Sequence, residues 1–277
     1  MNEAALRDIE IRLFLEALAL RHGYDFQNYA RASIKRRILG LAQAEGGLTV
    51  GELIPRLLRE EGFLSRVLAR LSVPVTEMFR DPPVFHALRR EVLPLLDSYP
   101  RVAIWQAGCA TGEECYSLGI LLKEAGLLDK TQIYATDIND KALADAEEGV
   151  YPAQEIVDYE QNYRKAGGGG RLADYFHTAY GYSKISDEIR RRIVFAHHNL
   201  VADGVFCEVH VVLCRNVLIY FDRTLQNRVT SLFHDSLVRG GFLCLGSRET
   251  LQFSDVAGQF RPVDRDCRIF KKTGAAP

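Results

Sequence analysis

Long apolar runs are missing from this 277-residue sequence. No stretch approaches the ~18 uninterrupted apolar residues of a membrane-spanning helix. The first residues, MNEAALRDIEIRLF, carry acids where a signal peptide has a basic segment and an apolar core. These absences predict a soluble, cytoplasmic protein without direct membrane insertion.

An excess of either charge is also missing, because 35 Lys and Arg residues face 36 Asp and Glu residues. A balanced chain gives no reason to expect nucleic acid or an anionic membrane as a partner. The six cysteines are scattered and none forms a CxxC pair. We therefore expect reduced, buried thiols and no metal site.

The 47% hydrophobic content is enough for one full-sized core and a smaller satellite domain. In residues 1–70, apolar residues recur at helical spacing and glycines supply the breaks. The repeating positions include Ile9, Leu13, Ala17 and Leu20, and the breaks are Gly23, Gly46, Gly47 and Gly62. This pattern predicts a small all-helical N-terminal domain.

One helix of that domain is basic: the segment YARASIKRRILG carries Arg31, Lys35, Arg36 and Arg37. At 3.6 residues per turn, Arg31 and Lys35 share a face beside Arg36 or Arg37. Either the helix has a solvated surface of no special role, or the four cations form a docking face.

Residues 71–100 are predicted to form a linker and a first helix, because the prolines of LSVPVTEMFRDPPV prevent a continuous helix. From residue 101 to 277, strand-like and helix-like segments alternate, with a small inserted subdomain near residues 150–190. The end, RPVDRDCRIFKK, resembles a last strand. The alternation predicts a doubly wound, Rossmann-like α/β domain whose ligands bind at the carboxyl ends of the strands. No chemistry is evident for the Gly167–Gly170 loop.

The turn QAGCATGEE follows the first predicted strand, and its small residues Gly108, Ala110 and Gly112 allow close approach of a ligand. Glu114 has two interpretations. With Thr111 it has the spacing of a helix capping box. Alternatively, its carboxylate repels a pyrophosphate and attracts an ammonium group.

Asp137 follows the next strand, where an acid can accept hydrogen bonds from both ribose hydroxyls of a nucleotide. Its alternative role is that of helix N-cap. The spacing from Gly108 exceeds the ~20 residues usual in a dinucleotide fingerprint, which weakens the case for NAD.

Polar residues also follow two later strands. Arg215, Asn216 and Tyr220 follow VHVVLC, and Asn199 follows RRIVFA. Tyr220 could instead be a core aromatic. The neighbouring His197 and His198 do not predict a metal site, because adjacent histidines point in different directions and lack a spaced third ligand.

Together these segments resemble the chemotaxis receptor methyltransferase (CheR) family over nearly the whole chain. The resemblance is carried by VTEMFRDP, WQAGCATGEECYS, ATDINDKALADAEEGVY, HHNL, LCRNVLIYFD and LGSRETL. It implies an S-adenosylmethionine-dependent enzyme, releasing S-adenosylhomocysteine, that forms glutamyl methyl esters on a chemotaxis receptor or receptor-like protein for sensory adaptation.

By resemblance, the cofactor pocket is lined by Thr76, Arg80, Glu114, Asp137, Asn199, Leu200, Arg215 and Asn216. The resemblance also implies that Tyr220 faces the transferred methyl group. We hypothesise that Arg80 takes part in catalysis by orienting the glutamate or closing the pocket. The basic helix with Arg31, Lys35, Arg36 and Arg37 is then expected to dock the receptor. Pro74 replaces an asparagine usual in the family. The short segment 176–189 favours a member that works without a tethering peptide.

Two rival functions share these features. An NAD-dependent dehydrogenase would also use a strand, a small-residue turn and a distal acid. A non-catalytic module that binds S-adenosylmethionine would keep the fold without turnover.

Overall fold

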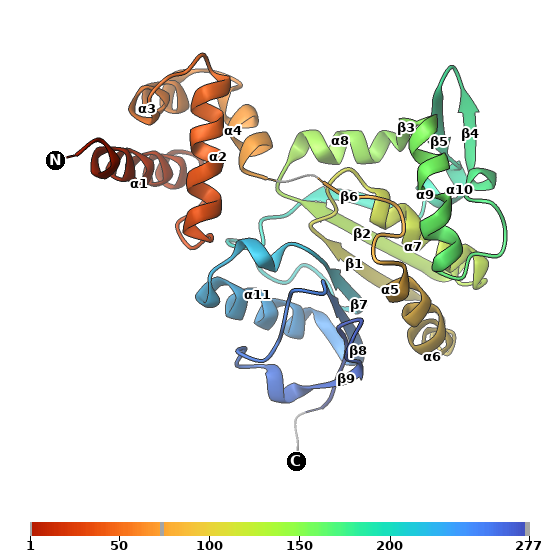
Figure 1. The fold of residues 1–277 in the computed structure, drawn as a ribbon. Coiled ribbons are helices and arrows are strands. Elements are labelled where there is room, and N and C mark those ends of the chain that lie inside the picture. The colour runs from red at the N-terminus through yellow and green to blue at the C-terminus, as the bar shows by residue number, and fades with distance from the viewer. Residues whose placement is uncertain (1, 73–74, 275–277) are drawn as a thin grey trace.

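The computed structural model describes residues 2–72 and 75–274, which form a helical part and an α/β part (Figure 1). Four helices make up the helical part: α1 (Glu3–His22), α2 (Arg31–Ala44), α3 (Val50–Arg59) and α4 (Phe63–Leu71). The Asn2 side chain caps α1 by accepting from the Ala5 N–H at 2.9 Å, and Gly23, with φ 78°, ends it. A left-handed residue at this position is the usual helix terminator. The predicted all-helical N-terminal domain is confirmed.

The core of the helical part lies between α1 and α3 and between α2 and α4. The helical spacing of α1 identified the helix but not its buried face. Leu13 and Leu20 are exposed, whereas the buried side chains of α1 are Ile11, Phe14, Leu15 and Leu18. Both sets have helical spacing, so the apolar pattern alone could not choose between them.

The chain between the two parts is not helical from residue 75 to 81, as the prolines predicted. Pro74 lies outside the described residues. The linker is anchored where Phe79, fully buried, donates its N–H to Ser117 Oγ at 2.8 Å. Helix α5 (Pro82–Ala87) follows, continued by a π-helical turn, Leu88–Val92, and by α6 (Leu93–Leu96). This anchor fixes Arg80 and Asp81 beside the central sheet.

The α/β part is built on a seven-stranded sheet in the order β6-β2-β1-β7-β8-β10-β9. The strands are β1 (Val102–Ala107), β2 (Thr131–Asp137), β6 (Ile193–His197), β7 (Val209–Cys214), β8 (Leu237–Leu245), β9 (Phe260–Asp264) and β10 (Ile269–Lys272). The first five are parallel, and β10 is antiparallel to both β8 and β9. The last segment, predicted as one strand, forms two because the chain turns between them at Arg268, whose φ is 55°.

Helices cover both faces of this sheet, which confirms the doubly wound, Rossmann-like fold. Ile104 of β1 packs with α7 (Glu113–Glu124) and α5, whereas the next residue, Trp105, packs with α11 (Arg223–Ser236) on the opposite face. This alternation follows from the pleat of a strand buried on both faces. Helix α8 (Asp140–Glu148) follows β2.

The segment between α8 and β6 adds a small antiparallel sheet, ordered β3-β5-β4. Its elements are β3 (Val150–Pro152), α9 (Ala153–Lys165), a short turn of helix (Leu172–Tyr175), β4 (Phe176–Ala179), β5 (Tyr182–Ile185) and α10 (Asp187–Arg190). The Gly167–Gly170 loop connects α9 to the helical turn, and Gly170 donates its N–H to Tyr163 Oη at 3.1 Å. Within residues 2–72 and 75–274, none of the helices has the length and apolar character to cross a bilayer.

Candidate active site

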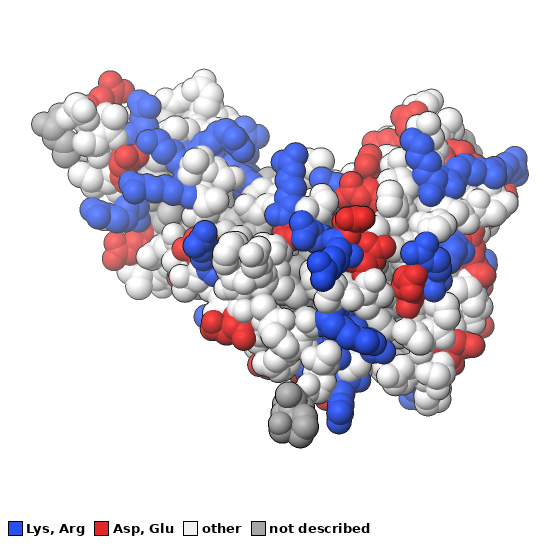
Figure 2. Space-filling view, turned by 60° about the horizontal axis from the view of Figure 1, so that its bottom comes forward, with Lys and Arg blue, Asp and Glu red and all other residues white. Residues whose placement is uncertain are grey.

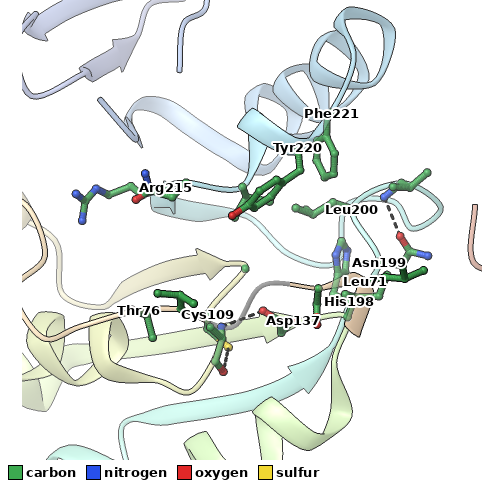
Figure 3. Close-up of a pocket in the computed structure, with 18 of the residues that line it drawn as sticks. Leu71, Thr76, Cys109, Asp137, His198, Asn199, Leu200, Arg215, Tyr220 and Phe221 are labelled. Atoms are coloured by element: carbon green, nitrogen blue, oxygen red, sulfur yellow. Dashed lines mark hydrogen bonds between the residues drawn. The ribbon is translucent and has the colours of Figure 1, made fainter. Parts of the chain in front are cut away.

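A pocket opens at the carboxyl ends of β1, β2 and β7, where the helical part meets the sheet (Figure 3). Its outline takes in about 1010 Å³ of non-atom space, open solvent at the mouth included. All the residues predicted for the cofactor and the methyl group line it: Thr76, Arg80, Glu114, Asp137, Asn199, Leu200, Arg215, Asn216 and Tyr220. The pocket thus brings together residues from five separate sequence segments.

The turn after β1 forms one wall of this pocket. Gly108 has φ 74°, and a Cβ at this position would lie 2.4 Å from Val217 Cγ2. Ala110 is also left-handed, with φ 50°. The turn is fastened to β2 by the N–H groups of Gly108 and Cys109, which donate to the Thr136 carbonyl at 2.8 and 3.0 Å. Only glycine fits at position 108, so backbone atoms rather than a side chain form this part of the wall.

Glu114 does not form the capping box that its spacing allowed. Thr111 Oγ1 instead donates to Glu113 at 2.7 Å, and α7 has no side-chain cap. The Glu114 carboxylate is buried, accepting from Arg215 at 2.6 Å and from Gln106 Nε2 at 2.9 Å. Its position in the pocket is therefore held by two partners.

Arg215 links Glu114 to the linker, because its other terminal nitrogen donates to Asp81 at 2.6 Å. Burial works against the charge of Arg215, but the groups around it, first Glu114 and also Asp81, together raise its pKa. The three groups carry one positive and two negative charges. Their net negative charge suits a cationic ligand group better than a phosphate.

Asp137 is held at the tip of β2 and is not the N-cap of α8. That cap is Asn139, whose Oδ1 accepts from the N–H groups of Lys141 and Ala142. Asp137 accepts from the Ala110 N–H at 2.9 Å and from the Asn139 N–H at 3.0 Å. Burial raises the pKa of Asp137, and these backbone donors work against that rise. A carboxylate has about four acceptor positions, so acceptor capacity remains for ligand hydroxyls.

The end of β6 supplies Asn199 and Leu200. Asn199 is buried and braced at both ends: its N–H donates to Asp203 at 2.8 Å, and its Oδ1 accepts from the Val201 N–H at 3.0 Å. The preceding histidines have separate partners, His197 with Asp140 and His198 with the Gly204 carbonyl. Across the described ranges, no cluster of His, Cys, Asp or Glu is arranged to hold a metal ion.

The loop after β7 carries Tyr220 into the pocket (Figure 3), and Asn216 of the same loop also lines it. Asn216 is left-handed, with φ 61°. The loop is held by the buried Glu249, which accepts from the Val217 N–H at 2.8 Å and the Gly246 N–H at 2.6 Å. Glu249 belongs to the segment LGSRETL, to which the sequence assigned no role.

Arg37 was predicted to lie on the docking face, and the structure corrects this. It is buried, donates to the Leu71 carbonyl at 2.5 Å, and places its guanidinium 4.4 Å from the centre of the Tyr220 ring. On a helix that turns about 100° per residue, Arg37 lies roughly 200° from Lys35, on the opposite face. It therefore belongs to the pocket, whose lining it joins.

The other three cations of α2 lie outside the pocket lining. Lys35 and Arg31 approach Asp8 at 2.6 and 3.9 Å, and Arg36 is exposed. Figure 2 shows Lys and Arg side chains over the helical part, interspersed with Asp and Glu. The sequence also missed two aromatic residues of the helical part, Phe26 and Tyr29, that line the pocket.

The pocket suits S-adenosylmethionine. Gln106 Oε1 is buried without a hydrogen-bond partner in the described part of the chain, so it can accept from an ammonium beside Glu114. Asp137 offers free acceptor positions to ribose hydroxyls. Ile138 and Leu200 add apolar surface for a base. Groups that suit the amino group, the ribose and the base of the cofactor thus follow β1, β2 and β6 in turn.

Two protein families match the chain. Residues 74–268 match the family described as "CheR methyltransferase, SAM binding domain", and residues 9–72 match "CheR methyltransferase, all-alpha domain". The two matches meet at the linker described above.

Individual proteins are similar over the same length. "Putative methyltransferase Cher3" of Pseudomonas putida is 50% identical, over 96% of this chain and 97% of its own. "Chemotaxis protein methyltransferase 1" of Pseudomonas aeruginosa is 31% identical, over 90% and 92%. A magnesium protoporphyrin IX methyltransferase of Synechocystis, solved with its cofactor bound, is 14% identical over 80% of this chain and 96% of its own, with a TM-score of 0.40. That structural likeness is too weak to argue from.

Proposed function

Since the chain belongs to the CheR methyltransferase family, we propose that it methylates glutamate side chains of a chemotaxis receptor or receptor-like protein. Dependence on S-adenosylmethionine follows from the family, whose matched domain binds this cofactor. The glutamate substrate is the proposed step. The observation that carries it is the approach of Arg37 to Tyr220 at the pocket, where a cation suits an anionic substrate.

A glutamate carboxylate needs no general base, because its reference pKa of ~4.3 leaves it ionised at pH 7. The bound cofactor supplies a methyl group on a sulfonium sulfur. A carboxylate oxygen held in line with that methyl group would displace the sulfur, which would keep both electrons of the broken carbon–sulfur bond. Holding the reacting atoms in line can contribute ~7 to 11 kcal/mol towards the barrier.

Arg80 and Tyr220 are the proposed catalytic residues. Arg80 donates to the Val75 carbonyl at 3.3 Å and lines the pocket, so its other N–H groups are available to orient the incoming carboxylate. Tyr220 lines the same pocket from the loop after β7 and is proposed to position the reacting groups. The guanidinium of Arg37 over its ring adds a second positive charge near the substrate.

The remaining pocket residues are proposed to bind the cofactor: Thr76, Glu114, Asp137, Asn199, Leu200, Arg215 and Asn216. Glu114 with Gln106 would hold the amino group of the methionine part. Asp137 would accept from the ribose, and Asn199 with Leu200 would contact the adenine. Arg215 would hold Glu114 in place, and Asn216 would line the pocket next to it.

Receptor docking is proposed to use Arg31, Arg36 and Lys35 on the outer side of α2. Lys35 contributes less than its neighbours, because Asp8 already neutralises it. Docking is also proposed to need no tethering peptide, since the segment from residue 176 to 189 is short. The receptor itself is recognised as a helical surface that displays glutamates.

Incubation with radiolabelled S-adenosylmethionine and receptor fragments tests this function. We expect labelled receptor that releases methanol in mild base, because an ester is hydrolysed whereas an N-methyl group stays attached. Label that resists mild base would refute glutamate esterification. Binding of S-adenosylhomocysteine without transfer to any receptor fragment would favour a non-catalytic module.

Substitutions at the two catalytic positions test the mechanism. Arg80→Ala and Tyr220→Phe should each lower kcat at saturating cofactor, by about tenfold or more if each positions reacting atoms. Near-normal turnover in both variants would contradict these roles. The family match does not favour NAD as the cofactor, and calorimetry with S-adenosylhomocysteine and NAD side by side compares the two directly.

A further inference from the structure

A short segment of the helical part runs along the loop that carries Tyr220. The Ala30 N–H donates to the Tyr220 carbonyl at 2.7 Å, and the Asp222 N–H donates to the Asn28 carbonyl at 2.8 Å. Tyr29 lies between these two bonds and forms a single antiparallel bridge with Phe221. The backbone of Tyr29 is thus fixed against the α/β part.

The Tyr29 ring is fixed as well. It packs against Phe26 at a centroid distance of 4.5 Å and against Phe221 at 4.9 Å. It touches both the core of the helical part and the core beside α11. A ring held by both cores has one orientation, and the residue lines the pocket in that orientation.

The Tyr29 hydroxyl is the unused polar group of this arrangement. No hydrogen bond joins it to any residue in the described ranges, although its ring is packed on two sides. Burial, followed by the negative charge of Asp137, raises the pKa of Tyr29, while Arg37 acts in the opposite direction. The hydroxyl therefore stays protonated and can both donate and accept.

We propose that Tyr29 is a cofactor-contacting residue supplied by the helical part, its hydroxyl hydrogen-bonding the adenosyl group on the side of Asp137. The helical part then completes the cofactor site as well as meeting the receptor. This inference rests on the cofactor site of the proposed function and is independent of the receptor substrate.

The alternative is that Tyr29 only packs, and Tyr29→Phe separates the two roles. This variant keeps the ring against Phe26 and Phe221 and removes the hydroxyl alone. We expect its Kd for S-adenosylhomocysteine, measured by calorimetry, to rise about fivefold to tenfold, the effect of one lost hydrogen bond. The Tm without ligand should stay unchanged.

Tyr24→Phe is the matched control. Tyr24 belongs to the same helical part and packs edge-on against His197 at 6.1 Å, but it does not line the pocket. Its loss of a hydroxyl should leave the Kd unchanged. The calorimetric stoichiometry reports the folded fraction, so a partly unfolded preparation lowers the stoichiometry and not the affinity.

Binding of 5′-methylthioadenosine shows which part of the cofactor the Tyr29 hydroxyl contacts. This compound keeps the adenosyl group and lacks the amino acid part, so Tyr29→Phe should weaken its binding by the same factor. An unchanged Kd for S-adenosylhomocysteine in Tyr29→Phe would overturn the inference, and so would a loss seen with S-adenosylhomocysteine but not with 5′-methylthioadenosine. If the wild type bound neither compound, the proposed function itself would fail.

Discussion

The buried carboxylate of Glu114 lines the pocket and also pairs with Arg215. Its side chain is 8% exposed and that of Arg215 is fully buried, so each ion depends on the other for its stability. Gln106 Nε2 also donates a hydrogen bond to Glu114. The second terminal nitrogen of Arg215 donates to Asp81. Because Asp81 belongs to the linker, the chain of contacts joins the cofactor pocket to Arg80.

Gly108 provides a residue-scale prediction. Gly108→Ala should destabilise the protein more than Gly23→Ala, and should also weaken the binding of S-adenosylhomocysteine. Both glycines are left-handed, with φ of 74° and 78°, so both substitutions carry backbone strain of about 1 kcal/mol. Only at Gly108 does the new Cβ meet another group, Val217 Cγ2 at 2.4 Å, whereas Gly23 has nothing within 4 Å.

Urea unfolding and calorimetry measure the two effects of Gly108→Ala. The difference between the variants isolates the steric contact, since backbone strain is common to both. Equal losses of unfolding free energy, with equal cofactor affinity, would show that the turn accommodates a side chain and would contradict its role as a bare backbone wall.

At the scale of elements, the sequence predicted the residues that follow strands but not those contributed by the helical part. Glu114, Asp137 and Asn199 could be found because the carboxyl ends of parallel strands meet at one edge. Arg37 and Tyr29 could not, because their places depend on how the helical part rotates against the sheet. Local periodicity has no information on that rotation, and for the same reason the buried face of α1 was not predicted.

The contact between the segment before α2 and the Tyr220 loop gives an element-scale prediction. Ala30→Pro removes the N–H that donates to the Tyr220 carbonyl at 2.7 Å. The backbone itself is suitable for proline, since Ala30 has φ −53°. We expect a fall in kcat, roughly tenfold, because the ring of Tyr220 loses its fixed place.

Ala32→Pro is the control for the segment before α2. Ala32 lies in the first turn of α2, where a helix N–H has no intrahelical partner and proline is tolerated. Methyl transfer and circular dichroism should both remain near wild type in this control. A normal kcat in Ala30→Pro would mean that the backbone contact does not position Tyr220.

At the scale of the whole molecule, the helical part and the α/β part both contribute to the pocket. Ile138, directly after Asp137, packs against the core of the helical part, and Asn139 Nδ2 donates to Ser72 Oγ at 2.9 Å. The helix α2 presents Arg37 to the pocket and Arg31 and Arg36 to the outside. One helix therefore connects the proposed docking face to the site of methyl transfer.

Charge reversal on the outer side of α2 tests the electrostatic docking that this arrangement suggests. Arg31→Glu combined with Arg36→Glu should raise the KM for receptor roughly tenfold at low salt, because exposed charges steer association. The same variant should lose most of the salt dependence of KM, since screening acts on the charges that were removed. The Kd for S-adenosylhomocysteine should not change, because neither residue lines the pocket.

A matched reversal far from α2 separates docking from net charge. Arg191→Glu changes an arginine beside α10 that is 76% exposed and whose one ion pair within residues 2–72 and 75–274 is with Asp187, at 3.9 Å. If net charge alone controlled association, this control and each single reversal on α2 would raise KM equally. An unchanged KM in the double variant at low salt would contradict the docking face, whereas a rise confined to α2 at constant kcat would place receptor recognition on the helix that also supplies Arg37.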